Sequence, residues 1–118
     1  MKDKKITARN EFRDNFVTGG KPHTSYVYGK QGQYWLNIPI TSEKKTRGKP
    51  NIEMTTNPNK GHKAKKGKSY FVPEARRTHK NKMSKYIRTD WTLDGNNAKL
   101  MQPYMAHEFD GKGKPKKS

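Results

Sequence analysis

The sequence of 118 residues contains no cysteine. This absence excludes disulfide bonds, cysteine zinc sites and thiol nucleophiles, and it is typical of proteins in a reducing compartment. Long apolar runs are also missing. No segment approaches the length of a membrane-spanning helix, and no apolar signal-peptide segment follows the basic N-terminus. We therefore expect a cytoplasmic protein without a membrane partner.

Hydrophobic residues are scarce, at 28% of the chain, while 31% is charged and the mean hydropathy is -1.34. Such a composition favours disorder, because little apolar surface is available to offset the entropy lost on folding. Aromatic residues nevertheless make up 10% of the chain, and each buries a large area. We predict a thin aromatic core beneath a lysine-rich surface, in one domain.

Acidic residues are few: ten Asp and Glu stand against 27 Lys and Arg, which gives a formal net charge of +17. Between Lys21 and Arg88 the imbalance is steeper, with 17 basic residues against three acidic ones. A field of this strength attracts polyanions, and each cation placed against a phosphate releases a counterion. The charge indicates RNA or DNA as the partner.

The clearest structural pattern lies at residues 25–40. Two runs of β-branched and aromatic residues, 25–28 and 33–40, flank a glycine-containing turn at 29–32, which predicts a β-hairpin. In the second run the apolar side chains of Leu36, Ile38 and Ile40 alternate with Trp35 and other residues. Alternation places these two sets on opposite faces of the strand.

The other elements are short. We predict strands at 51–55 and 69–73, and helices at 8–16 and 98–105. Basic segments separate them, and residues 111–118 have the composition of a disordered basic tail. The expected fold is mainly β, a small SH3-like barrel or curled antiparallel sheet with short helices and long basic loops, in a single domain over 1–110.

Several chemistries lack support. The four histidines are scattered, without acidic residues at ligand spacing, so we predict no metal site. The Gly-Lys-Ser at 67–69 lacks both the Walker spacing and a preceding apolar strand. The acidic residues are dispersed and form no catalytic pair. What remains suits RNA cleavage without a cofactor, in which a base activates the 2′-OH, cations stabilise the phosphorane and an acid protonates the leaving oxygen.

Residues 21–42 resemble the MazF/PemK-like toxin endoribonucleases. In that family a basic loop runs into a strand, and after a turn a second strand ends in a Pro-apolar-Thr-Ser motif, here Pro39-Ile40-Thr41-Ser42. The resemblance implies an SH3-like barrel that cleaves single-stranded RNA without metal, often as a homodimer neutralised by an antitoxin. It also implies an active-site position for Thr41 and Ser42. Lys21 stands where the family has a catalytic arginine, and His23 could supply the missing acid or base.

We therefore predict a metal-independent endoribonuclease of toxin type that acts on single-stranded RNA. The predicted catalytic residues are His23, Thr41, Ser42, Arg76, Arg77 and His79. The predicted nucleic-acid-binding residues are Lys21, Trp35, Lys44, Lys45, Arg47, Lys63, Lys65, Lys66, Lys68 and Arg88. Trp35 is included as a base-stacking platform, because it lies on the strand face opposite Leu36 and Ile38.

Two alternatives belong to other classes. One is a non-enzymatic nucleic-acid-binding protein of a phage or mobile element, including an inhibitor that occupies the nucleic-acid groove of a host enzyme. The other is a structural RNA-associated protein whose basic loops become ordered on RNA. Turnover of RNA distinguishes the enzyme from both, since a binding protein yields no product and shows stoichiometric, salt-dependent affinity.

Overall fold

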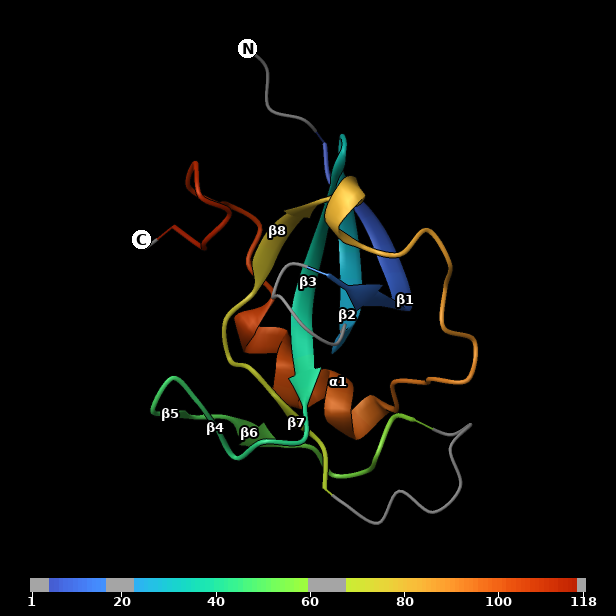
Figure 1. Cartoon of the computed structure of the whole chain (residues 1–118), viewed down its shortest axis with the longest axis vertical. Helices are drawn as coiled ribbons and strands as arrows, with labels where there is room; N and C mark the ends of the chain where they lie inside the picture. Colours follow the sequence, from blue (N-terminus) through green and yellow to red (C-terminus); the bar gives the residue numbers. More distant parts are fainter. Residues whose placement is uncertain (1–4, 17–22, 60–67, 117–118) are drawn as a thin grey trace.

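The computed structural model describes residues 5–16, 23–59 and 68–116. Its main feature is an antiparallel sheet with strand order β1-β2-β3-β7-β6, in which β8 also pairs with β3 (Figure 1). The strands are β1 (Thr7–Asn15), β2 (His23–Gln31), β3 (Tyr34–Thr41), β6 (Ile52–Glu53), β7 (Tyr70–Phe71) and β8 (Arg76–His79). The expected mainly β architecture is confirmed, and over the described residues the sheet is open rather than closed into a barrel.

The predicted hairpin is the centre of the sheet. β2 and β3 pair from Gln31 opposite Tyr34 to Ser25 opposite Pro39, and a bulge lies between Val27 and Gly29. A Cβ at Gly29 would lie 3.0 Å from Cγ2 of Ile6 and 3.3 Å from Cδ1 of Leu36. Glycine therefore fits this bulge best, because a larger residue would require the side chains of Ile6 and Leu36 to shift by a few tenths of an ångström.

The helix predicted over 8–16 is wrong, because these residues form β1 and pair with β2. The prediction rested on the four-residue spacing of Phe12 and Phe16. In the structure Phe12 is buried, whereas Phe16 is 48% exposed at the end of the strand. The long-range pairing with β2 prevails over a local pattern that fits a helix and a strand equally well.

β3 is long enough to pair with two different strands on its far side. Its first half, Tyr34 to Asn37, pairs with β8, and its end, Ile40 and Thr41, pairs with β7. The fully buried Asn37 fastens β8 in place, because its Nδ2 lies within hydrogen-bond distance of the Arg76 carbonyl and of Thr78 Oγ1.

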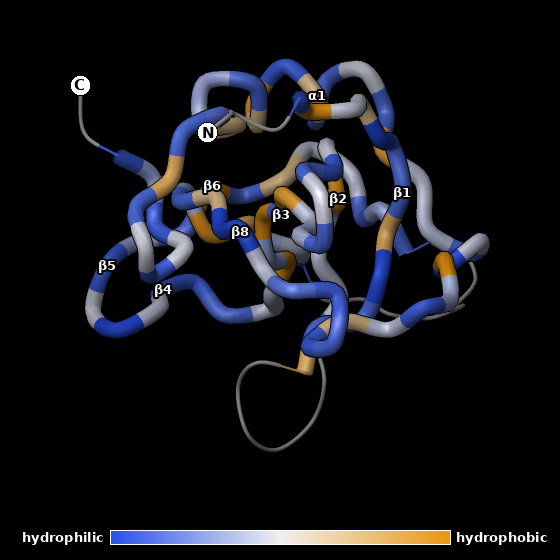
Figure 2. Tube along the Cα trace, turned by 90° about the horizontal axis from the view of Figure 1, so that it is seen from above, coloured by the Kyte–Doolittle hydropathy of each residue, from blue (hydrophilic) through white to orange (hydrophobic). Residues whose placement is uncertain are grey.

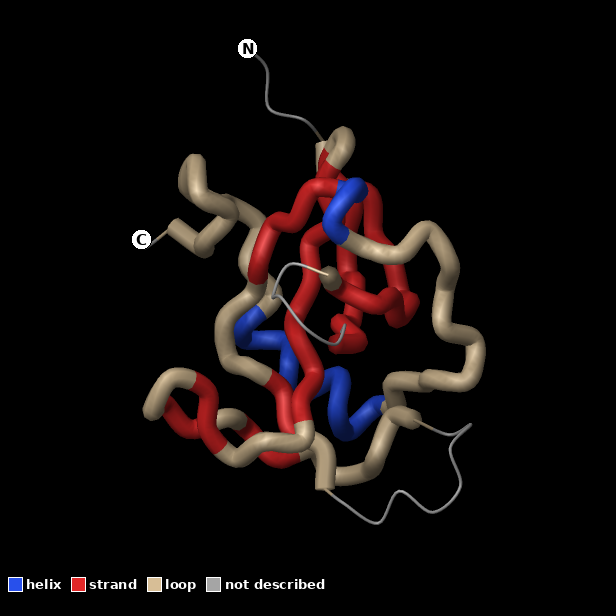
Figure 3. Tube along the Cα trace, in the orientation of Figure 1, coloured by secondary structure: helices blue, strands red, loops and turns tan. Residues whose placement is uncertain are grey.

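The core lies between the sheet and the short helix α1 (Gly95–Met101), which is followed by the 3-10 turn η2 (Gln102–Tyr104) (Figures 2 and 3). Leu36, Ile38 and Ile40 all belong to this core, whereas Trp35 belongs to a second cluster with Val27 and Met83. The predicted alternation of β3 is thus confirmed. The C-terminal helix predicted over 98–105 begins earlier and ends its α-helical part before Pro103.

α1 is joined to the 51–59 segment by one buried amide. Asn97 Oδ1 accepts hydrogen bonds from the N–H and hydroxyl of Thr55, and its Nδ2 donates to the carbonyl and hydroxyl oxygens of Thr56. Asp94 caps the same helix by accepting from the Asn97 N–H at 2.8 Å. The predicted strand over 51–55 is confirmed only at β6, because the residues after it turn toward the helix.

Two peripheral segments differ from the basic loops that we expected. β4 (Lys45–Thr46) and β5 (Lys49–Pro50) form a small hairpin, turned by Arg47 and Gly48, both at positive φ. The predicted disorder of 111–118 also differs from the structure over 111–116. There the chain bends back. Phe109 and Pro115 form an isolated antiparallel β-bridge, and the Gly113 carbonyl accepts a hydrogen bond from the Arg77 N–H. Residues 117–118 lie outside the described ranges.

Residues 80–91 run along the outer edge of β1. After the 3-10 turn η1 (Lys80–Lys82), the Ser84 N–H donates to the Asp14 carbonyl, and the Arg88 N–H donates to the Phe12 carbonyl. The second half of the β1 edge, from Phe12 onward, is thus covered rather than exposed. No helix in the described ranges is long and apolar enough to span a membrane.

Candidate functional site

A cleft of about 230 Å³ lies at the end of the β2–β3 pair. Ten residues line it: His23, Thr24, Ile40, Thr41, Ser42, Asn57, Asn59, Lys68, Ser69 and Trp91. Three predicted catalytic residues, His23, Thr41 and Ser42, therefore lie in one cleft together with Lys68, a predicted nucleic-acid-binding residue.

The antiparallel pairing explains this grouping. His23 begins β2 and Thr41 ends β3. The register that places Ser25 opposite Pro39 brings these two strand ends to the same edge of the sheet. His23 and Ser42 are exposed, and Thr41 is half-buried with its Oγ1 accepting from the Glu43 N–H. The imidazole and the hydroxyl groups are thus open to a ligand in the cleft.

The opposite wall comes from two loops that are distant in sequence. Asn59 and Trp91 form an isolated antiparallel β-bridge, and the Thr92 N–H donates a hydrogen bond to the Pro58 carbonyl at 2.9 Å. Asn57 Oδ1 accepts from the Asn59 N–H and from the Ser69 hydroxyl, which holds the loop ends together. Asn59 Oδ1 and Trp91 Nε1 are buried and have no hydrogen-bond partner within the described ranges.

Lys68 brings a positive charge to the cleft. Its Nζ lies 3.3 Å from Glu53 Oε2, and the two side chains are 67% and 49% exposed. An ion pair this exposed contributes little to stability. A phosphate entering the cleft can therefore replace Glu53 as the partner of the ammonium group at small cost.

Arg88, predicted to bind nucleic acid, lies beside the cleft and is held by two carboxylates. Its Nη1 is 3.1 Å from Asp14 Oδ1, and its Nε and Nη2 bond both oxygens of Asp90. Hydrogen bonding to Asp90, followed by the charges of Asp14 and Asp90, raises the pKa of the guanidinium above its ordinary value. The same group lies 5.8 Å from the centre of the Trp91 ring. Arg88 thus supports the cleft wall.

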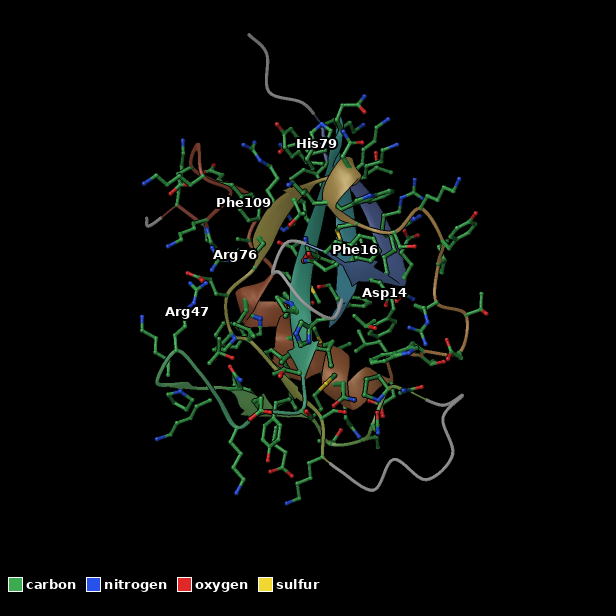
Figure 4. All side chains as sticks on the ribbon, in the orientation of Figure 1. Asp14, Phe16, Arg47, Arg76, His79 and Phe109 are labelled. Atoms are coloured by element: carbon green, nitrogen blue, oxygen red, sulfur yellow. The ribbon has the colours of Figure 1, made fainter. Side chains whose placement is uncertain are left out.

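The predicted catalytic residues of β8 lie elsewhere. His79 pairs with Tyr34, which lies seven residues along β3 from Thr41, about 23 Å at the usual rise of a strand. Arg76 forms an ion pair with Glu74, and the Arg77 guanidinium lies 4.6 Å from the centre of the Tyr34 ring. Figure 4 shows Arg76 and His79 along β8, well apart from Asp14. The structure does not bring these three residues to His23.

The remaining predicted binding residues divide into three groups. Lys44, Lys45 and Arg47 are exposed at the β4–β5 hairpin and do not line the cleft; Figure 4 shows Arg47 at this hairpin. Lys21, Lys63, Lys65 and Lys66 lie outside the described residues. Trp35 is 9% exposed, and the Arg13 guanidinium lies 4.3 Å from its ring centre. Its ring is therefore already in contact with a cation rather than presented to a base.

Sequence reasoning missed the second wall of the cleft. Asn57, Asn59 and Trp91 are not among the predicted site residues. No local pattern pairs Asn59 with Trp91, because their contact depends on the path of the whole chain.

The described part of the chain contains no group of three or more His, Asp or Glu side chains arranged to hold a metal ion. Comparisons with protein-family models, curated proteins and solved structures return no match to this chain. The likeness of residues 21–42 to the toxin endoribonucleases therefore rests on its short motif, and the function must be argued from the cleft.

Proposed function

We propose that this protein is a metal-independent endoribonuclease of toxin type, and that the His23 cleft is its active site. The observation that carries the proposal is the meeting of His23, Thr41, Ser42 and Lys68 in one cleft. RNA cleavage by the 2′-OH uses a base, an acid and a cation near the phosphoryl oxygens, and the imidazole and the ammonium group can fill these roles while the two hydroxyl groups hold the phosphate. The net charge of +17 supplies the attraction for RNA.

The proposed reaction is an internal transesterification. His23 accepts the proton of the ribose 2′-OH, and the 2′-oxygen attacks phosphorus as the bond to the 5′-oxygen breaks. The Lys68 ammonium offsets the charge on the phosphoryl oxygens and donates a proton to the leaving 5′-oxygen. Thr41 and Ser42 orient the phosphate through their hydroxyl groups. The products are a 2′,3′-cyclic phosphate and a free 5′-hydroxyl.

Two further features belong to this proposal. Cleavage of cellular RNA places the protein in the cytoplasm, which agrees with the lack of cysteine. The family resemblance adds a neutralising antitoxin and a homodimer. Coexpression with a small acidic protein encoded by a neighbouring open reading frame, followed by size-exclusion chromatography, tests for both the antitoxin and the homodimer.

The deciding experiment incubates single-stranded RNA with the purified protein in EDTA. We expect fragments that end in a 2′,3′-cyclic phosphate, strong loss of activity in His23→Ala, and unchanged activity in the matched control His79→Ala. Intact RNA with the unaltered protein, or equal activity of the two variants, contradicts the proposal.

A non-enzymatic nucleic-acid-binding protein is the second candidate. One observation favours it: the two histidines among the predicted catalytic residues, His23 and His79, lie near opposite ends of β3, so of the two only His23 lines the cleft formed by the described residues. If the protein only binds nucleic acid, the incubation with RNA in EDTA gives a stable, salt-dependent complex and no cleavage product.

A further inference from the structure

A second pocket, of about 370 Å³, lies near the turn of the β2–β3 hairpin. Its lining residues are Arg13, Trp35, Lys80, Asn81 and Lys85. It is distinct from the His23 cleft and shares no lining residue with it; Trp35 and Thr41 are six residues apart on β3, about 20 Å at the usual strand rise. We call it the Trp35 pocket.

Positive charge converges on the indole of Trp35. The guanidinium carbons of Arg13 and Arg9 lie 4.3 Å and 5.5 Å from the ring centre, and Lys30 Nζ lies 5.5 Å from it. The negative face of an aromatic ring attracts cations, and Trp does so most strongly. The ring therefore gathers cations that would otherwise repel one another.

Arg13 is held firmly for a charged side chain. It is 7% exposed, its Nε donates to Glu11 Oε2 at 2.6 Å, and its Nη1 donates to the Ser84 carbonyl at 3.1 Å. These bonds use two of its five N–H groups. A guanidinium fixed in this way is suited to recognise an anion, because little side-chain entropy remains to be lost.

The positive charge of the pocket exceeds what its surroundings neutralise. Glu11 is the acid that pairs with both Arg9 and Arg13. Lys80 and Lys85 are exposed and form no ion pair within the described ranges, and Arg9 Nε is buried without a partner there. Uncompensated cations around one pocket repel each other. A bound anion would relieve that repulsion.

We infer that the Trp35 pocket binds phosphate groups of a single-stranded nucleic acid. Charge concentrated in one pocket suits the dense negative charge of neighbouring phosphates better than carboxylates spread along an acidic peptide. Asn81 adds a neutral amide at the wall, where it can bond to a sugar or base. The inference rests on the proposed function for its substrate class, and it makes the pocket a second anchor for the strand that enters the His23 cleft.

The test uses single-stranded DNA, which lacks the 2′-OH and is not cleaved by the proposed reaction. The variant Lys80→Gln/Lys85→Gln removes two exposed cations of the pocket. Its matched control, Lys49→Gln/Lys99→Gln, removes two exposed lysines that do not line it. We expect the pocket variant to bind the DNA roughly tenfold or more weakly at low salt. The slope of log affinity against log salt concentration should decrease in magnitude by about 0.7 for each lysine removed.

Intrinsic fluorescence gives a readout specific to the pocket, because the chain has only two tryptophans. In Trp91→Phe, Trp35 is the sole reporter. We expect the DNA oligomer and inorganic pyrophosphate to change its emission saturably, and the Lys80→Gln/Lys85→Gln background to abolish the change.

Two results overturn the inference: equal affinity and salt slope in the pocket variant and its control, or competition by polyglutamate as effective as that by DNA. The second would assign the pocket to an acidic protein. If the unaltered protein leaves RNA intact but the pocket variant still loses DNA affinity, the endoribonuclease proposal fails and the pocket stands. If RNA is cleaved but the pocket variant and its control bind DNA equally well, the inference about the pocket is wrong and the endoribonuclease proposal is unaffected.

Discussion

Arg88 Nη1 lies 3.1 Å from Asp14 Oδ1, and this ion pair joins segments 74 residues apart. The same Asp14 oxygen accepts the hydroxyl of Thr24, which lines the His23 cleft. Arg88 also bonds both carboxylate oxygens of Asp90. The cation therefore connects the end of β1, the start of β2 and the loop that carries Trp91.

Replacing Arg88 should destabilise the fold around the cleft. Arg88→Gln removes three charge-assisted hydrogen bonds, of which the pair to Asp90 is bidentate. We expect the free energy of unfolding to fall by about 1 to 2 kcal/mol, since these groups are only about two-thirds buried. Arg47→Gln removes the same charge from an exposed residue and should cost less than about 0.5 kcal/mol. Urea unfolding of both variants measures the difference, and equal stabilities would contradict the role of Arg88.

Removing the buried amide of Asn97 should be more severe. Asn97→Ala deletes four hydrogen bonds to Thr55 and Thr56 and leaves a gap where the fully buried amide was. We expect a loss of about 2 to 4 kcal/mol in the free energy of unfolding. Asn96→Ala changes the exposed neighbour and serves as the control. Because the 51–59 segment also carries Asn57 and Asn59, RNA cleavage should decline in Asn97→Ala, and a thermal melt beside the cleavage assay tests both expectations.

The half of the cleft formed by the hairpin was predictable from the sequence. An antiparallel hairpin brings the residue before its first strand and the residue after its second strand to one edge. The positions of His23, Thr41 and Ser42 relative to the turn were therefore sufficient to predict that these three residues lie close together. The faces of β3 followed from the alternation of Leu36 and Ile38 with the other residues.

The other half was not predictable, because it depends on contacts between distant segments. Asn59 reaches Trp91 only after residues 80–91 have run along β1. The spacing of Phe12 and Phe16 fits a helix, and only pairing with β2 makes it a strand. The surroundings of Trp35 were not predictable for the same reason: its strand face followed from the alternation, but the Arg13 guanidinium that contacts the ring comes from another strand.

The buried phenol of Tyr28 should make the fold sensitive to alkali. Burial raises the pKa of Tyr28 above its ordinary value of 10.0, and its hydroxyl donates to the Ala106 carbonyl. A raised folded-state pKa means that the stabilisation is complete below about pH 10 and is lost as the pH rises beyond it. Tyr28→Phe should be about 1 kcal/mol less stable at neutral pH, through the lost hydrogen bond, and should lose less stability above pH 10. Urea unfolding across this range measures both effects. Tyr86→Phe, at a 69% exposed residue, should follow the unaltered protein.

The C-terminal turn should depend on Gly113 and not on Gly111. Gly113 has φ +80°, and a Cβ there would lie 2.6 Å from the Arg77 carbonyl oxygen, whereas a Cβ at Gly111 would meet nothing within 4 Å. The left-handed conformation alone costs another residue about 1 to 2 kcal/mol, and the clash with backbone adds to it. Gly113→Ala should therefore separate the turn from β8 and break the hydrogen bond from the Arg77 N–H to the Gly113 carbonyl. Faster amide hydrogen exchange at Arg77 in Gly113→Ala, and an unchanged rate in Gly111→Ala, is the expected result. Equal exchange rates would mean that the turn does not hold β8, because a detached turn must leave the Arg77 amide open to water.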